Sequence, residues 1–181
     1  MEENVRNILN FWFKESQPKD WFKKDKKFDD TIKFRFFDLI MSSLNNELQH
    51  WKINLEGSLA LIILLDQFTR NVFRGSKKSF SGDAMALEIS SYCIKEDYLS
   101  ISKQEWCHFF LIPMMHSEDL NIQNQSLPLF KKYTGENTYN FAVKHQKIIS
   151  EFGRFPHRNI VLGRKSTVQE LAFLNKPGSS F

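Results

Sequence analysis

The chain has 181 residues and a formal net charge of +4, and 41% of its residues are hydrophobic, so it can bury the core of one domain. Its 18 phenylalanines give that core an aromatic character, while only seven glycines and five prolines favour long helices over a turn-rich β fold. So weak a positive charge does not indicate a nucleic-acid partner. The N-terminus carries acidic residues ahead of its apolar part, unlike a signal peptide, and no apolar run is long enough to span a bilayer. We therefore expect a soluble, cytoplasmic protein with no membrane partner.

The first part of the chain predicts two helices joined by a loop. Apolar residues recur at helical spacing over 5–13, and again over 26–46. The intervening segment combines lysines with Trp21 and Phe22, and we interpret it as a solvated loop whose aromatic side chains pack inward. Lysine beside tryptophan can indicate nucleic-acid binding, but acidic residues interrupt this run.

Residues 55–74 are apolar on all sides of a helical projection and predict a central helix that is fully buried. Its last turn carries Asp66 and Arg70, four residues apart, with Gln67 and Asn71 one step further round. An unpaired buried charge is costly, and a helix dipole disfavours an anion near the C-terminus, so these groups need polar partners. They form either an ion pair that holds the helix in register or part of a functional site.

Helices continue through the rest of the chain, and no strand is indicated. The polar loop over 75–82 contains glycines and lysines but lacks the order of a phosphate-binding loop. Helical spacing and end signals then predict helices over 82–96, 102–113, 117–133, 137–152, 156–162 and from 167 to a tail at 176–181.

Local signals mark the ends of several of these helices. Ser102 with Glu105, and Thr167 with Glu170, match the capping-box pattern at a helix start. Pro113 should bend or end its helix. These signals support the predicted helix boundaries.

Charge is unevenly distributed along the chain. Residues 83–120 contain seven acids and two lysines, whereas 144–176 contain seven bases and two acids. This pattern favours docking of one segment on the other, although the basic segment could also form a concave face for an anionic ligand.

Two further polar motifs stand at breaks between helices: MHSED at 115–119 and GRFPHRN at 153–159. Helix breaks leave backbone groups free, and helix N-termini attract anions. Together with the end of the central helix, these segments could form one cleft.

The three polar motifs strongly resemble a mostly bacterial family known only as a domain of unknown function, DUF 924. The resemblance is carried by 64–71 (LLDQFTRN), 115–119 and 153–159, with agreement at 11–13, 170–171 and 177–178. It covers nearly the whole chain and implies one all-helical, tetratricopeptide-like superhelical domain, 1–181, but no established reaction. The chain has Thr69 where the family has Pro, and Ser180 where the family has Gly. Neither departure removes a candidate functional group.

The fold we predict is all-α, with about eight helices arranged around the buried central helix. Where the three motifs converge we predict a polar or anionic small-molecule site. An enzyme of hydrolase type would use His157 as acid or base with Asp66 as its partner, and Arg70 and Arg158 as anion clamps. The full set of candidates is His157, Asp66, His116 and Glu118 for catalysis, and Arg70, Asn71, Gln67, Arg154, Arg158 and Asn159 for ligand binding.

Two other readings stay open. The polar motifs could be a purely structural network, or the chain could be a tetratricopeptide-like scaffold that binds a peptide or protein in a concave groove. A closed pocket would favour the small-molecule site, and an open groove would favour the scaffold.

No metal or other cofactor is predicted. His116 and Glu118 could ligate a metal with His157 or Asp66, but their spacing is not that of a known two-histidine motif on one helix. The remaining histidines and the two cysteines stand among apolar residues, and we expect them to be packing or surface residues: His50, His108, His145, Cys93 and Cys107.

Overall fold

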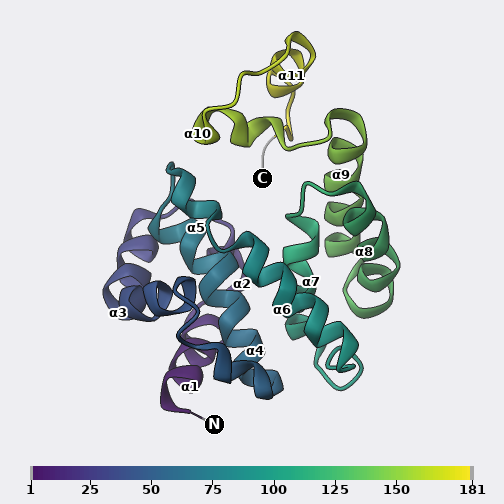
Figure 1. Cartoon of the computed structure of the whole chain (residues 1–181). Helices are drawn as coiled ribbons and strands as arrows, with labels where there is room; N and C mark the ends of the chain where they lie inside the picture. The colour runs from purple at the N-terminus through teal and green to yellow at the C-terminus, as the bar shows by residue number, and fades with distance from the viewer. Residues whose placement is uncertain (1, 180–181) are drawn as a thin grey trace.

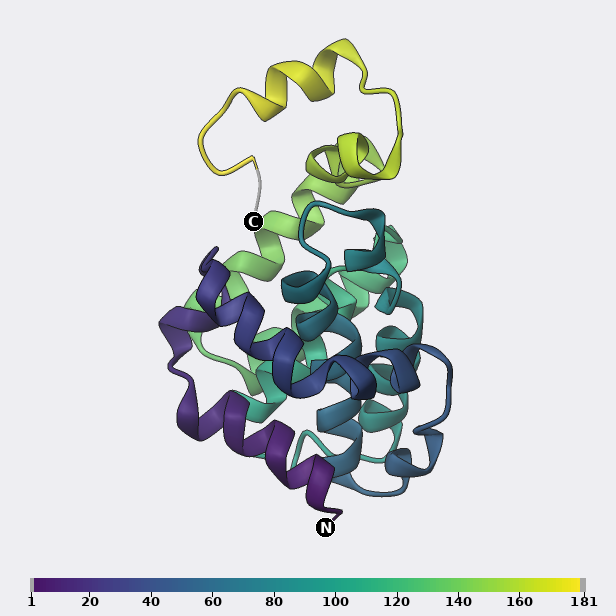
Figure 2. The same cartoon turned by 90° about the vertical axis from the view of Figure 1, so that its left-hand side faces the viewer.

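The computed structural model describes residues 2–179, and over that range the regular structure is entirely helical, which confirms the predicted all-α class. Ser180, one of the two departures from the family pattern, lies outside the described residues. Within 2–179 no helix is both long and apolar enough to cross a membrane. The α-helices shown in Figures 1 and 2 are α1 (Glu3–Asn10), α2 (Pro18–Trp21), α3 (Lys26–Leu44), α4 (Leu55–Ile62), α5 (Thr69–Val72), α6 (Asp83–Lys95), α7 (Gln104–Met115), α8 (Leu120–Tyr133), α9 (Glu136–Phe152), α10 (Asn159–Leu162) and α11 (Val168–Leu174).

The centre of the fold is a helical column formed by α4, a π-helical segment at Ile63–Phe68, and α5. Leu59, Leu64 and Phe68 are completely buried in it, as expected for a stretch that is apolar on all sides. Helices α1, α3, α6 and α7 pack around this column (Figure 1). The buried central helix is therefore as predicted, except that its middle turns widen to the π form. Such π turns occur frequently at functional sites.

An aromatic layer attaches the N-terminal segment to the column. Trp12 is fully buried between Phe68 and Phe109, with ring centroids 5.5 and 5.6 Å away. Trp21 stacks on Trp12 at 5.8 Å and donates its indole N–H to the Trp12 carbonyl at 2.9 Å. The predicted loop before α3 thus contains the short helix α2, with Trp21 packed inward as expected, whereas Phe22 is 61% exposed.

From α6 to α9 each helix packs against the next one along the chain, an arrangement compatible with a tetratricopeptide-like array (Figure 1). Pro113 lies inside α7, which continues to Met115, so of the two predicted effects of this proline the end of the helix is wrong. The capping box at Ser102 is also wrong, because its hydroxyl donates to the Tyr98 carbonyl at 2.6 Å and α7 begins after Lys103. The N-cap position of α7 is occupied by Lys103, whose side chain has no acceptor, and not by Ser102.

The C-terminal segment turns back after α9. Gly153 ends α9 with φ 69°, a left-handed conformation that glycine adopts without steric cost. A 3₁₀ turn at Pro156–Arg158 then leads into α10, and the predicted capping box of Thr167 and Glu170 is present at the start of α11. This path lies at the top of Figure 2, and Arg158 on it contacts the carbonyl of His116 in the body of the molecule.

The acidic and basic segments dock on each other, as their charge pattern favoured. Arg164 contacts the Glu118 carboxylate through both terminal nitrogens, at 2.6 and 3.0 Å. Glu118 also accepts the backbone N–H of Phe155 at 2.8 Å. Burial opposes ionisation of Glu118, but Arg164 and this N–H outweigh it and keep its pKa below the usual range. Glu118 therefore holds the turn that carries Arg158.

Candidate functional site

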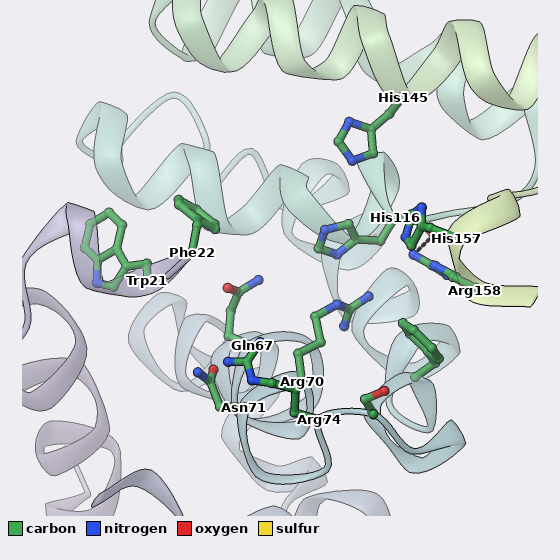
Figure 3. Close-up of a pocket in the computed structure, with 13 residues that line it drawn as sticks. Trp21, Phe22, Gln67, Arg70, Asn71, Arg74, His116, His145, His157 and Arg158 are labelled. Atoms are coloured by element: carbon green, nitrogen blue, oxygen red, sulfur yellow. Dashed lines mark hydrogen bonds between the residues drawn. The ribbon is translucent and has the colours of Figure 1, made fainter. Parts of the chain in front are cut away.

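A pocket of about 240 Å³ opens beside the C-terminal end of the central column (Figure 3). Side chains from all three polar motifs reach it, together with residues from the α2 region, the segment after α5, and α9. The lining residues are Trp21, Phe22, Gln67, Arg70, Asn71, Arg74, Gly75, Ser79, Phe80, His116, His145, His157 and Arg158.

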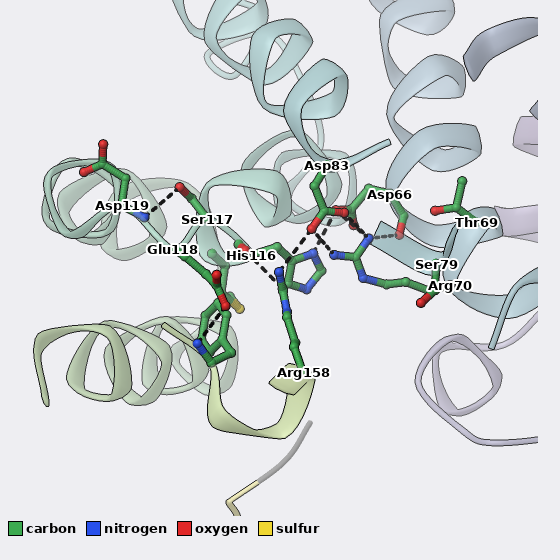
Figure 4. Close-up of polar contacts among 12 residues, drawn as sticks. Asp66, Thr69, Arg70, Ser79, Asp83, His116, Ser117, Glu118, Asp119 and Arg158 are labelled. Carbon is green, nitrogen blue, oxygen red and sulfur yellow. Dashed lines mark hydrogen bonds and ion pairs between the residues drawn. The ribbon is translucent and has the colours of Figure 1, made fainter. Parts of the chain in front are cut away.

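Asp66 lies fully buried behind the pocket wall and organises three of its neighbours (Figure 4). Its Oδ1 atom is 2.8 Å from Nδ1 of His116 and 3.1 Å from Nη1 of Arg70, and its Oδ2 atom accepts from the Gln67 amide at 2.6 Å. Burial opposes ionisation of Asp66, but Arg70, His116 and Gln67 more than offset it, so the pKa of Asp66 lies well below its usual range. The sequence pairs Asp66 with His157, whereas the imidazole that contacts Asp66 at 2.8 Å is that of His116.

Asp83, the first residue of α6, bridges the two arginines that the sequence predicts as an anion clamp. Its Oδ1 atom is 2.9 Å from Nη1 of Arg70, and its Oδ2 atom accepts from Nη1 of Arg158 at 3.2 Å (Figure 4). The approach depends on Gly82, because a Cβ atom there would lie 2.2 Å from the carbonyl oxygen of Leu65. The clamp therefore already holds a carboxylate of the chain itself.

Arg158 is fixed by aromatic rings and by polar contacts. Its guanidinium lies between Phe80 and Phe155, 4.7 and 4.6 Å from the ring centroids, and its Nη2 atom donates to the His116 carbonyl at 3.0 Å. Burial, followed by the charge of Arg70, lowers the pKa of Arg158 to about 10, so it remains a cation at neutral pH.

Three histidines line the pocket in the neutral form. Burial is the main cause that lowers the pKa of His157 to about 4 and of His145 to about 3, and it also lowers the pKa of His116. His145 donates from Nδ1 to the Phe141 carbonyl at 2.8 Å and lines the pocket, whereas the sequence predicts a packing or surface residue. No group of three or more His, Cys, Asp or Glu residues within 2–179 is arranged to hold a metal ion.

Asp29 of α3 holds two further side chains that line the pocket. It accepts from the Asn71 amide at 2.7 Å and from Arg74 at 2.7 and 2.8 Å. Gln67 and Asn71, neighbours on the predicted helix, therefore bond to different acids.

Besides Asp66, which lies behind the wall, three predicted site residues do not line the pocket. Arg154 contacts Glu170 at 2.6 and 2.9 Å, and Asn159 donates to the Ser166 hydroxyl at 3.1 Å, so both hold the C-terminal segment together. Glu118 does the same through Arg164. Each of these three residues belongs to the same short motif as His116, His157 or Arg158. Because successive side chains of a turn point in different directions, membership of the motif does not place a side chain in the pocket.

Several residues in or behind the pocket wall carried no functional signal in the sequence. Asp83 looks like an ordinary acid in the first turn of a helix, and Trp21 looks like a core aromatic. Only their positions in space associate them with the polar motifs.

The model of a family of bacterial proteins of unknown function, DUF924, matches residues 8–178. The chain belongs to the DUF924 family. The solved structure of ATU0120, a protein of unknown function from Agrobacterium tumefaciens, is 35% identical in sequence and superposes with a TM-score of 0.90, covering 94% of this chain and 96% of that one. No curated protein matches the chain. For this DUF924 protein, the comparisons thus support the family and the helical fold, and they name no reaction.

Proposed function

We propose that the pocket binds a small polar metabolite and that His116, oriented by Asp66, acts on it as a general base. The observation that carries this proposal is the 2.8 Å contact between Nδ1 of His116 and the fully buried Asp66 carboxylate. An ionised carboxylate can only accept, so His116 donates from Nδ1 and keeps Nε2 as its basic atom. The carboxylate also stabilises the imidazolium that forms when His116 takes a proton.

The reaction class that fits these groups is hydrolysis or a related group transfer. Neutral His116 takes a proton from water while the water oxygen attacks the substrate, and the same proton then passes to the leaving group. Arg158 is held rigidly as a cation and would stabilise negative charge that develops in the transition state. His157 lines the same pocket and is a second candidate for proton transfer.

The shape and lining of the pocket support a small ligand over a peptide groove. Polar groups from distant segments converge on a cavity of about 240 Å³, with Trp21, Phe22 and Phe80 as apolar walls. Small-molecule sites combine apolar walls with a few oriented polar groups in this way.

The proposal is tested with the variant His116→Gln. Glutamine can still donate to Asp66 but cannot act as a base, so we expect turnover of a hydrolysable substrate found by screening esters and amides to fall by about 10²–10⁴-fold. The melting temperature should stay close to that of the wild type. His50→Gln, at an exposed histidine 59% accessible in its side chain, is the matched control. Unchanged turnover in His116→Gln, or a wild-type protein that no small polar compound stabilises against heat, would overturn the proposal.

A further inference from the structure

We infer that the ligand of this pocket presents an uncharged, planar group rich in N–H donors, as in a primary amide or a nucleobase. The inference rests on the proposed function and names the class of ligand for that site. It starts from the acids behind the pocket wall, which determine how the polar side chains in front of them are turned.

Three side chains that line the pocket each donate a hydrogen bond to a carboxylate behind the wall. Gln67 and His116 donate to Asp66 at 2.6 and 2.8 Å, and Asn71 donates to Asp29 at 2.7 Å. Ionised carboxylates accept hydrogen bonds and cannot donate them, so the orientation of each amide and of the imidazole follows from chemistry. Each group thereby keeps an acceptor atom for the pocket: Oε1 of Gln67, Oδ1 of Asn71 and Nε2 of His116. A ligand that satisfies these atoms must supply N–H or O–H donors.

The formal charges around the pocket balance. Each arginine in the wall is paired with an acid, and burial keeps the lining histidines neutral. Neither a free anion nor a free cation would find an uncompensated partner there, which favours an uncharged ligand. The balanced groups are Arg70, Arg74 and Arg158 with Asp29, Asp66 and Asp83.

One buried donor complements the acceptors. Nε of Arg158 is buried and has no hydrogen-bond partner among the described residues, while the Phe80 and Phe155 ring centroids lie 4.7 and 4.6 Å from its Cζ atom. This unused N–H suits a ligand that also carries one carbonyl or ring-nitrogen acceptor. A ligand with N–H donors beside one acceptor matches this arrangement, and Trp21 and Phe22 on the opposite side of the pocket offer surface for an apolar ring (Figure 3).

The test uses four probes that share one benzene ring: benzamide, N,N-dimethylbenzamide, benzoate and benzylammonium. Binding is measured on the full chain at pH 7 by NMR titration, following the indole N–H signal of Trp21. We expect benzamide to bind about tenfold or more tightly than each of the others, because each of them loses a donor or adds an unpaired charge at a buried site. Tightest binding of benzoate or benzylammonium would overturn the inference, as would equal binding of the dimethyl compound or binding of none of the four.

Variants separate this inference from a general loss of structure. Gln67→Leu and Asn71→Leu each delete a pocket acceptor, and each should weaken benzamide by about tenfold while leaving N,N-dimethylbenzamide unchanged. Gln146→Leu is the matched control, since the Gln146 amide bonds to Asn124 away from the pocket. If benzamide bound both pocket variants as tightly as the wild type, Gln67 and Asn71 would not supply the acceptors for the ligand, and the inference would be refuted. If benzoate binds best and His116→Gln still abolishes turnover, this inference fails and the proposed function stands.

Discussion

Asp66 shows how a single carboxylate can remain ionised at the centre of an apolar core. It is completely buried, yet Arg70 and His116 contact one of its oxygens and Gln67 the other. The same contacts that lower its pKa also orient the imidazole toward the pocket. Asp66 therefore contributes both to the stability of the core and to the proposed role of His116 as a base.

We predict that Asp66→Ala is strongly destabilising and that His157→Ala is not. Removing Asp66 takes from Arg70 its fully buried partner and leaves it the half-buried Asp83, which should cost about 3–5 kcal/mol and lower the melting temperature by roughly 6–20 °C. His157 follows a proline in a 3₁₀ turn at the pocket, so its truncation should leave the melting temperature nearly unchanged or raise it slightly. Thermal unfolding followed by circular dichroism measures both, with exposed Asp30→Ala as the control. Aggregation of His157→Ala on expression would count against a role in the pocket.

Buried histidines should make the protein acid-sensitive. The pKa of His108 and of His157 is lowered to about 4, and that of His145 to about 3, all mainly by burial. The unfolded chain therefore binds protons near pH 6.5 while the folded chain does not, so stability falls as the pH drops from about 6.5 toward 4.

Between pH 7 and pH 5 we expect these three groups to remove about 1–2 kcal/mol each, and the melting temperature to fall by roughly 6–24 °C. Differential scanning calorimetry across this range measures the effect. His157→Ala should reduce the slope, and His50→Ala should not. A melting temperature that is constant from pH 7 to 5 would contradict neutral burial of the three histidines.

At the scale of elements, the π-helical segment and the start of α6 together build the charged wall of the pocket. Ile63–Phe68 carries Asp66 on the central column, and Gly82 lets the chain approach that column so closely that Asp83 reaches both Arg70 and Arg158. The position of α6 is therefore set by a backbone contact as much as by side-chain packing.

We predict that Gly82→Ala disrupts this approach. A Cβ atom 2.2 Å from the Leu65 carbonyl oxygen forces α6 away from the column, at a cost of about 1–3 kcal/mol or more. Asp83 should then lose contact with Arg158, and amide hydrogen exchange should accelerate at the start of α6 and over Pro156–Arg158. Gly135→Ala is the control, because its nearest atom is a flexible side-chain oxygen at 3.8 Å. Equal stability of the two variants would show that α6 can shift without consequence.

At the scale of the whole molecule, the C-terminal segment is joined to the body mainly by charge. A small apolar cluster under α11, with Phe152 and Phe173 packed at its edge, is separate from the main core. Glu118 and Asp83 make the ion pairs that cross between the two regions. The pocket lies where these regions meet, so its assembly requires both.

We therefore expect the chain to unfold as one cooperative unit. Calorimetric and van't Hoff enthalpies should agree, and Phe173→Ala, which removes a ring 5.0 Å from Phe152, should lower the temperature of the single transition. The far-ultraviolet circular dichroism spectrum should be strongly helical before the transition. Two separate transitions, with only the first shifted by Phe173→Ala, would show that the C-terminal segment folds independently.

The sequence by itself determined the helices, the buried central column and the three polar motifs. Those features depend on local spacing: apolar residues at helical intervals, the capping box at Thr167 and Glu170, and the left-handed glycine at Gly153. Such features involve residues close together in the sequence, so they can be predicted without knowing how the helices pack. Even the widening of the column at Ile63–Phe68, a change of local winding, left its burial as predicted.

Only the tertiary structure decided which polar groups meet. Asp83 and Arg158 are 75 positions apart, and Asp29 and Asn71 are 42 apart, so no local pattern connects them. The same holds for the pairing of Asp66 with His116, 50 positions away, and for the separation of Arg154 from the pocket. A buried charge requires a partner, which the sequence can indicate, but the identity of that partner depends on how distant helices pack.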